Sequence, residues 1–314
     1  MKMYTYKMKT GIKPSREFAK KGLASHAVNI GLKCGHGCTY CSTAAMIRAH
    51  GAFKELGVSP FDNTYSIVDP TTPERVAHDA HYIRKRGLVQ LCTIVDAWSP
   101  EAQQFNLGRK CLEAILSEPG WTVRILTKNA ILAKDFDLIE KYRGRVLVGL
   151  SITATPDKRD VMSVIEPYAS SIPDRIAALR DARTRGLRTY GMLCPLLPGI
   201  ADSPNQIDEL IKIATEFGSE EIFAEAVNPR GRGLILTQQA LKDGGFNAES
   251  AAIASIRVRA VWSEYVTNLI KNLQRSVRTH SDIKKLKFLL YPKGLEKHDL
   301  EEIKQDDGGV VWLQ

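Results

Sequence analysis

The chain has 314 residues, of which 44% are hydrophobic, and a formal net charge of +9. A chain of this length can bury a large core, and one barrel-sized domain with appendages suits it better than two equal domains. No apolar run in the sequence approaches the roughly 18 residues of a membrane span, and residues 1–15 lack the hydrophobic stretch of a secretion signal. We therefore expect a soluble, cytoplasmic protein that makes no contact with a membrane.

The positive charge is concentrated at the two ends of the chain. Residues 1–25 carry seven lysines and arginines against Glu17 alone, and residues 250–300 carry ten against four acidic residues. Because lysine and arginine release counterions from a phosphate backbone, basic ends on a near-neutral body suit a protein that binds DNA or RNA. A solvated surface with a basic tail is the alternative interpretation.

Short β-branched runs alternate with helical patterns from residue 26 to about residue 228. This alternation is typical of parallel strands joined by crossover helices. Thr71 with Glu74, and Ser203 with Gln206, have the spacing of capping boxes and indicate two of the helix starts. We predict strands at His26–Lys33, Val89–Asp96, Thr122–Lys128, Arg145–Thr153, Arg188–Pro195 and Glu221–Val227.

Six such units predict an α/β fold, a partial (β/α)6 TIM-like barrel with a lateral mouth for a large substrate. Residues 49–70 show little periodicity, so we expect a loop beside this mouth. We therefore divide the chain into a basic N-terminal arm (1–25), the barrel (26–228) and a helical C-terminal cap or extension (229–314). The extension shows a turn at Pro229–Gly233, a long helix at Ala248–Thr279, a strand at Lys285–Tyr291 and a tail ending in Val310–Leu313.

Three of the six cysteines lie within eight residues, as Cys34, Cys38 and Cys41. This crowding suits a thiolate-ligated centre better than a disulfide framework, and the glycines between the first two cysteines free the backbone to wrap a compact inorganic core. Three thiolates hold three irons of a [4Fe–4S] cubane and leave the fourth iron open for an external ligand. In this chemistry the ligand is S-adenosylmethionine (SAM), whose C–S bond is cleaved by one electron to give a 5′-deoxyadenosyl radical.

A zinc site is the structural alternative, with His26 or His36 as the fourth ligand. Zinc sites usually combine two separated C-x2-C pairs, however, and the sequence contains no second pair. Tyr40, the residue before the last cysteine, is either a core aromatic or a partner of the SAM adenine.

With these motifs the sequence resembles the radical SAM superfamily and, within it, the spore photoproduct lyase-like family of DNA-repair-type proteins. The resemblance implies that Asp96, Lys128 and Ser151 contact the methionine end or the ribose of SAM, that Tyr40 lies at the adenine, and that Thr153 belongs to the same cofactor-binding set. It runs from about residue 29 to residue 199 and rests on Cys34-x3-Cys38-x2-Cys41, Val95-Asp96 with Pro100-Glu101, Ile125-Leu126-Thr127-Lys128, Ser151-Ile152-Thr153, Glu166-Pro167 and Pro195-Leu196-Leu197-Pro198-Gly199.

The positions of these polar residues favour the same site independently. Asp96, Lys128 and Ser151 each lie at the carboxyl end of a predicted strand, where barrel active sites are assembled from several strands. For each residue the alternative is a loop edge exposed to water. Glu166 and Asn228 are weaker candidates that also suit a helix end or a turn.

Two positions depart from the family pattern. Ser42 follows the last cysteine, where the lyase pattern has a tyrosine that helps to return the hydrogen atom. Cys92, a possible hydrogen donor, lies one position from where the family would place it, and on a strand one position reverses the face of the side chain. Cys92 is therefore either a catalytic thiol or, like Cys111 and Cys194, a buried core thiol.

We expect a radical SAM enzyme that abstracts a hydrogen atom from a nucleic-acid or nucleotide-like substrate. The same chemistry on a peptide or small metabolite is the first alternative, and a non-catalytic nucleic-acid-binding protein with a structural metal is the second. Because the sequence has no further cysteine cluster, we expect an external one-electron donor of the flavodoxin or ferredoxin type.

Overall fold

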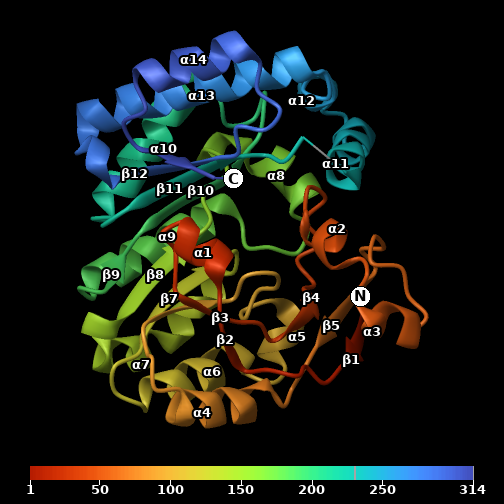
Figure 1. The fold of residues 1–314 in the computed structure, drawn as a ribbon. Coiled ribbons are helices and arrows are strands. Elements are labelled where there is room, and N and C mark those ends of the chain that lie inside the picture. Colours follow the sequence, from red (N-terminus) through yellow and green to blue (C-terminus); the bar gives the residue numbers. More distant parts are fainter. Residues whose placement is uncertain (230, 314) are drawn as a thin grey trace.

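The computed structural model describes residues 1–229 and 231–313, and its main feature is a curved, largely parallel sheet wrapped by helices (Figure 1). The first part has the strand order β2-β3-β6-β7-β8-β9 and the second β10-β11-β12-β13. A bridge between Ser151 and Met192 joins the two parts, so that they form the wall of one partial barrel. The strands are β2 (Ile12–Pro14), β3 (His26–Val28), β6 (Leu88–Leu91), β7 (Thr122–Thr127), β8 (Val146–Leu150), β9 (Arg188–Thr189), β10 (Gly191–Leu196), β11 (Ile222–Ala226), β12 (Leu286–Leu290) and β13 (Val310–Trp312).

Helices cover the outer face of this sheet (Figure 1). The predicted capping box is confirmed at Ser203, whereas Thr71, the N-cap residue of α4, makes no side-chain capping bond and instead donates its hydroxyl to Asp69. The helices are α1 (Arg16–Lys20), α2 (Thr43–Ile47), α3 (Gly51–Glu55), α4 (Thr72–Tyr82), α5 (Pro100–Gln103), α6 (Leu107–Leu116), α7 (Phe136–Lys141), α8 (Arg159–Ile165), α9 (Ile172–Thr184), α10 (Pro204–Glu216), α11 (Arg232–Asp243), α12 (Asn247–Ser255), α13 (Arg259–His280) and α14 (Lys297–Gln305).

Two apolar clusters lie on the two faces of the sheet. The larger one fills the space between the strands and the outer helices. The smaller one lies inside the barrel, because side chains alternate between the two faces of a strand. Its buried members are Leu23, Leu147, Tyr190, Met192, Phe223, Leu289 and Leu313.

The predicted strand at 26–33 is two strands that belong to different sheets. β3 pairs with β6 in the barrel, whereas β4 (Gly31–Lys33) pairs with β5 (Tyr65–Val68) in a separate sheet of order β1-β5-β4, whose first strand is β1 (Lys2–Thr5). Between β3 and β4, the Asn29 side chain accepts from the backbone N–H groups of Thr93 and Ile94, which also explains why β6 ends before the predicted limit. β5 further shows that residues 49–70, expected to be a loop, contain a strand.

The first 25 residues pack against the rest of the chain. β1 pairs with β5 and β2 pairs with β3. Phe18 of α1 packs against the apolar cluster inside the barrel. The basic segment that we expected to form an arm therefore contributes two strands and a helix to the folded body.

The C-terminal part continues the parallel sheet. β12 pairs with β11 and β13 pairs with β12, both in parallel, so the C-terminal extension adds two parallel strands to the predicted barrel wall. The long helix expected at Ala248–Thr279 is divided into α12 and α13, and position 230 of the predicted turn lies outside the described residues. Within the described residues no helix is both long and apolar enough to cross a membrane.

Candidate active site

The three clustered cysteines line one cavity between β4 and α2. Cys34, Cys38 and Cys41 share this small cavity, about 50 Å³ in volume, with Lys33 and Phe53. Burial raises the pKa of the Cys38 thiol to about 12 and that of Cys34 well above its usual value, and the three sulfur groups also act on one another. A metal centre that binds them must therefore displace protons, as thiolate ligation requires.

Hydrogen bonds and glycine geometry fix the path of this cysteine loop. The backbone N–H of Gly35 donates to Glu101 Oε1 at 2.8 Å, and a Cβ at this position would lie 2.4 Å from the second oxygen of the same carboxylate. Gly37 has φ +68°, a left-handed conformation that side chains other than glycine rarely adopt. The sequence prediction that both glycines shape the loop is consistent with these contacts.

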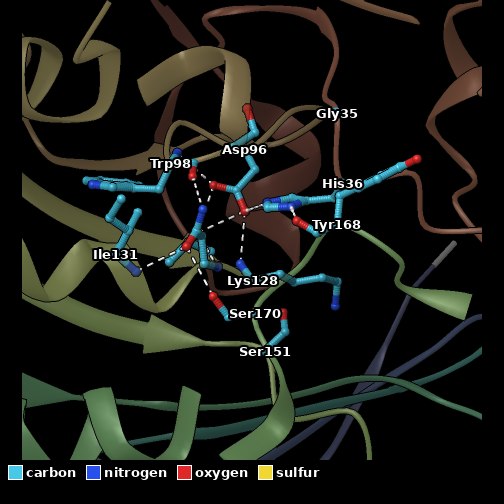
Figure 2. Close-up of polar contacts among 12 residues, drawn as sticks. Gly35, His36, Asp96, Trp98, Lys128, Ile131, Ser151, Tyr168 and Ser170 are labelled. Carbon is cyan, nitrogen blue, oxygen red and sulfur yellow. Dashed lines mark hydrogen bonds and ion pairs between the residues drawn. The ribbon is translucent and has the colours of Figure 1, made fainter. Parts of the chain in front are cut away.

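Asp96 connects the cysteine loop to the end of β7 (Figure 2). Its carboxylate accepts from His36 Nε2 at 2.8 Å, the Thr127 hydroxyl at 2.8 Å, the Trp98 N–H at 2.8 Å and the Lys128 N–H at 2.9 Å. Burial alone would raise the pKa of Asp96, but His36 and these donors hold it below its usual value. Four donors fill the acceptor positions of one carboxylate, so Asp96 is placed to position the loop, and a direct contact with SAM would have to displace one of them.

The two candidate zinc-binding histidines are both engaged elsewhere. His36 contacts Asp96 through Nε2 and the Tyr168 carbonyl through Nδ1, at 3.1 Å. His26 lies at the start of β3, packs edge-on against Trp121 and contacts Ser25 through Nδ1. Among the described residues, no three histidine, cysteine or acidic side chains converge as a single-ion site. Either histidine would have to leave these partners to complete a Cys3His zinc site.

A second network surrounds Glu166, in the turn after α8. The Tyr40 hydroxyl and the Arg175 guanidinium donate to its carboxylate, Lys128 Nζ lies 3.2 Å from Oε1, and the Thr153 hydroxyl donates at 3.3 Å. Burial alone would raise the pKa of Glu166, but Arg175 and Lys128 lower it to about 2. Three predicted SAM-binding residues therefore meet at one carboxylate, which the sequence analysis ranked only as a weaker candidate.

Arg175 was missed by the sequence analysis. It is fully buried in α9 and also donates to the backbone carbonyls of Ser151 and Ser170, at 2.9 and 2.8 Å. The available signal was its spacing from Ile172, Ile176 and Leu179, which are buried on the same helix. An arginine at such a position requires a buried partner.

The remaining predicted residues occupy different places. Ser151 lies directly after β8, is 4% exposed, and is drawn beside Lys128 in Figure 2. Cys92 is buried with Cys111 in the core between the sheet and the outer helices, a placement that suits a core thiol. Cys194 lies on the opposite face, where it packs against the cluster inside the barrel and donates to Glu225 Oε2 at 3.6 Å.

Comparison with known proteins gives matches at the level of sequence and of fold. A sequence model described as the Radical SAM superfamily matches residues 28–214. The uncharacterized protein ORF301 of Acidianus two-tailed virus is 26% identical over 218 residues, which are 66% of this chain and 69% of that protein. The uncharacterized protein MJ0683 of Methanocaldococcus jannaschii is 25% identical over 179 residues, which are 57% of this chain and 63% of that protein.

Solved structures of spore photoproduct lyase share the fold. One mutant superimposes with a TM-score of 0.59 and 15% identity, covering 88% of this chain and 79% of the lyase chain. A second mutant, with bound AdoMet and dinucleoside spore photoproduct, has a TM-score of 0.53 and 16% identity, covering 76% and 66%. At these identities the likeness concerns the partial barrel and its extensions.

Proposed function

The chain belongs to the radical SAM superfamily, whose enzymes use a [4Fe–4S] cluster and SAM, and from this we propose that it abstracts a hydrogen atom from a nucleic-acid substrate. The observation that carries the proposal is the cavity lined by Cys34, Cys38 and Cys41, beside the residues held around Glu166. When bound, the cluster and SAM supply one-electron cleavage of a carbon–sulfur bond. The chain itself has to bind, orient and enclose the reactants.

The residues around Glu166 have the chemistry to hold SAM. Lys128 offers an ammonium group that suits the SAM carboxylate, and Ser151 and Thr153 offer hydroxyl groups at the carboxyl end of β8. Lys128 Nζ lies 5.6 Å from the centre of the Tyr40 ring, so a cation and an aromatic face are adjacent. In our proposal Glu166 and Arg175 are positioning residues that hold these groups, and Asp96 positions the cysteine loop.

Exposed lysines near the N-terminus support a phosphate-bearing substrate. Lys2, Lys7, Lys9, Lys13 and Lys20 form no ion pair with any residue that the structure describes. The cations of α13 differ, because three of them pair with acids of the following segment. These pairs are Arg259–Glu296, Lys271–Glu302 and Arg278–Asp306. Because these three cations already have acidic partners, we assign the phosphate-binding role to the N-terminal segment.

The spore photoproduct lyase fold supports the same substrate class, since one of those structures holds a dinucleoside photoproduct. Reduction of the cluster is assigned to an external donor of the flavodoxin or ferredoxin type. A peptide or small-metabolite substrate would leave the N-terminal lysines without a role.

Anaerobic reconstitution with iron and sulfide, followed by reduction in the presence of SAM, tests the proposed function. We expect formation of 5′-deoxyadenosine and, with a deuterated oligonucleotide, transfer of deuterium into that product. A reconstituted protein that never cleaves SAM would contradict the proposal and favour a non-catalytic role. Cleavage with deuterium transfer only from peptides would refute the substrate assignment.

A further inference from the structure

A cavity of about 450 Å³ lies at the carboxyl ends of β11 and β12, under α13. Its size falls within the range of roughly 300–1,000 Å³ typical of small-molecule sites. Aromatic and aliphatic side chains form most of its wall, among them Trp262, Val266, Tyr291 and Leu295. A single acidic side chain, Glu225, also lines it.

The cavity lies at the same end of the barrel as the candidate SAM site. In the register of the sheet, Ser151 pairs with Met192, and Met192 pairs with Phe223. Cys194 and Glu225 each lie two residues further along their strands and hence on the same inward face. The Cys194 thiol contacts Glu225 Oε2 at 3.6 Å, so these two inward-facing side chains adjoin at this end of the sheet.

Glu225 brings an acidic acceptor to a mostly apolar wall. Among the residues that the structure describes, the Cys194 thiol, a weak donor, contacts its carboxylate at 3.6 Å. A carboxylate has about four acceptor positions, so further donors can be accommodated from the cavity. Burial raises the pKa of Glu225, the positive charge of Lys21 opposes that rise, and the same charge disfavours a second cation as ligand.

We propose, on the basis of the nucleic-acid function above, that this cavity receives one unstacked base of the substrate and that Glu225 determines its identity by accepting from N–H groups on the edge of the base. Flat aromatic walls are the surfaces on which single bases stack. Carboxylates read base edges by accepting hydrogen bonds. Guanine matches best, because its N1–H and its amino group present two adjacent donors and no charge.

Nucleoside binding to the full-length protein, measured by titration calorimetry, tests this proposal. We expect guanosine to bind more tightly than inosine, which lacks the amino group. Glu225→Gln keeps the shape of the side chain but removes its charge and one acceptor. It should weaken guanosine binding by about 10-fold or more, as expected for a hydrogen bond to a charged group, and reduce the difference from inosine.

Val266→Trp fills the cavity and should abolish binding of both nucleosides, with folding verified by thermal unfolding. If this variant does not fold, the guanosine and inosine affinities of Glu225→Gln alone test the proposal. The proposal is overturned if no nucleoside binds at millimolar concentration, if Glu225→Gln leaves the preference unchanged, or if N-acetyltryptophanamide binds in place of nucleosides. If only this proposal is wrong, the protein will still cleave SAM and bind DNA in a salt-dependent way. If the proposed function is wrong, SAM cleavage will be absent, and nucleoside binding can still be measured.

Discussion

Glu166 shows how a buried charge holds together residues from several elements. Its carboxylate contacts Tyr40 of the cysteine loop, Lys128 after β7 and Arg175 of α9. Because these cations lower its pKa from 4.5 to about 2, folding favours the ionised form. In the unfolded chain the carboxyl takes up its proton at the ordinary pKa, so the stabilisation is complete above about pH 4.5 and is lost as the pH falls through 2.

We therefore predict that Glu166 makes stability depend on pH in this acid range. The shift of 4.5 to about 2 corresponds to a contribution of about 3 kcal/mol. Urea unfolding at several pH values between 6 and 2 should show a steeper loss of stability in wild type than in Glu166→Gln. Asp137, a surface carboxylate paired with Arg109, is a matched control, and Asp137→Asn should change the pH dependence far less because solvent screens the pair. Equal slopes in wild type and Glu166→Gln would refute this role.

Substitutions in the network around Glu166 should affect SAM binding without preventing folding. Lys128→Ala leaves Glu166 paired with Arg175, and Ser151→Ala removes only a hydroxyl, so both variants should fold and keep the cluster. We expect each to weaken SAM binding by about 1–3 kcal/mol, since a charge-assisted or neutral hydrogen bond is lost. Equilibrium dialysis with labelled SAM measures this effect. Unchanged affinity in both variants would reject the pocket around Glu166.

At the scale of elements, the sequence pattern predicted most strands but not which sheet each joins. β7 and β11 lie within the predicted ranges because apolar, β-branched runs form buried parallel strands. The division between β3 and β4 could not be predicted, since it depends on Asn29 reaching residues more than 60 positions away. The network around Glu166 was hidden for the same reason: its members are distant in sequence, and each taken alone resembles a helix end or a loop edge.

Gly31 makes the close approach of β4 and β5 possible. A Cβ there would lie 2.2 Å from the Ile67 carbonyl oxygen, which is too close for any side chain. We predict that Gly31→Ala destabilises the protein by about 1–3 kcal/mol, as overpacking does, and reduces iron incorporation because β4 leads directly into the cysteine loop. Gly51→Ala is the control, since a Cβ at that position meets nothing within 4 Å. Denaturant unfolding and iron content measure both effects, and equal behaviour of the two variants would refute the explanation.

For the whole molecule, charge placement predicts how binding depends on salt. The slope of log DNA affinity against log salt concentration should become shallower when Lys7, Lys9 and Lys13 are replaced with glutamine. We expect a change of about one unit for each lysine that contacts a phosphate. The same replacement of Arg259, Lys271 and Arg278 should change it little, because these cations already pair with acids. Fluorescence anisotropy with a labelled oligonucleotide across a salt series compares the two triple variants. A larger change from the α13 variant would reverse the assignment of the phosphate-binding surface.

The most direct test of the account is the iron and sulfide content of the anaerobically reconstituted protein and its Cys38→Ala variant. We predict about four irons per chain in the wild type and loss of the cluster in Cys38→Ala, because each thiolate holds one iron. Cys92→Ala, which changes a buried core thiol, should retain the cluster and serves as the matched control. A full cubane in Cys38→Ala, or tightly bound stoichiometric zinc in the wild type, would contradict the account.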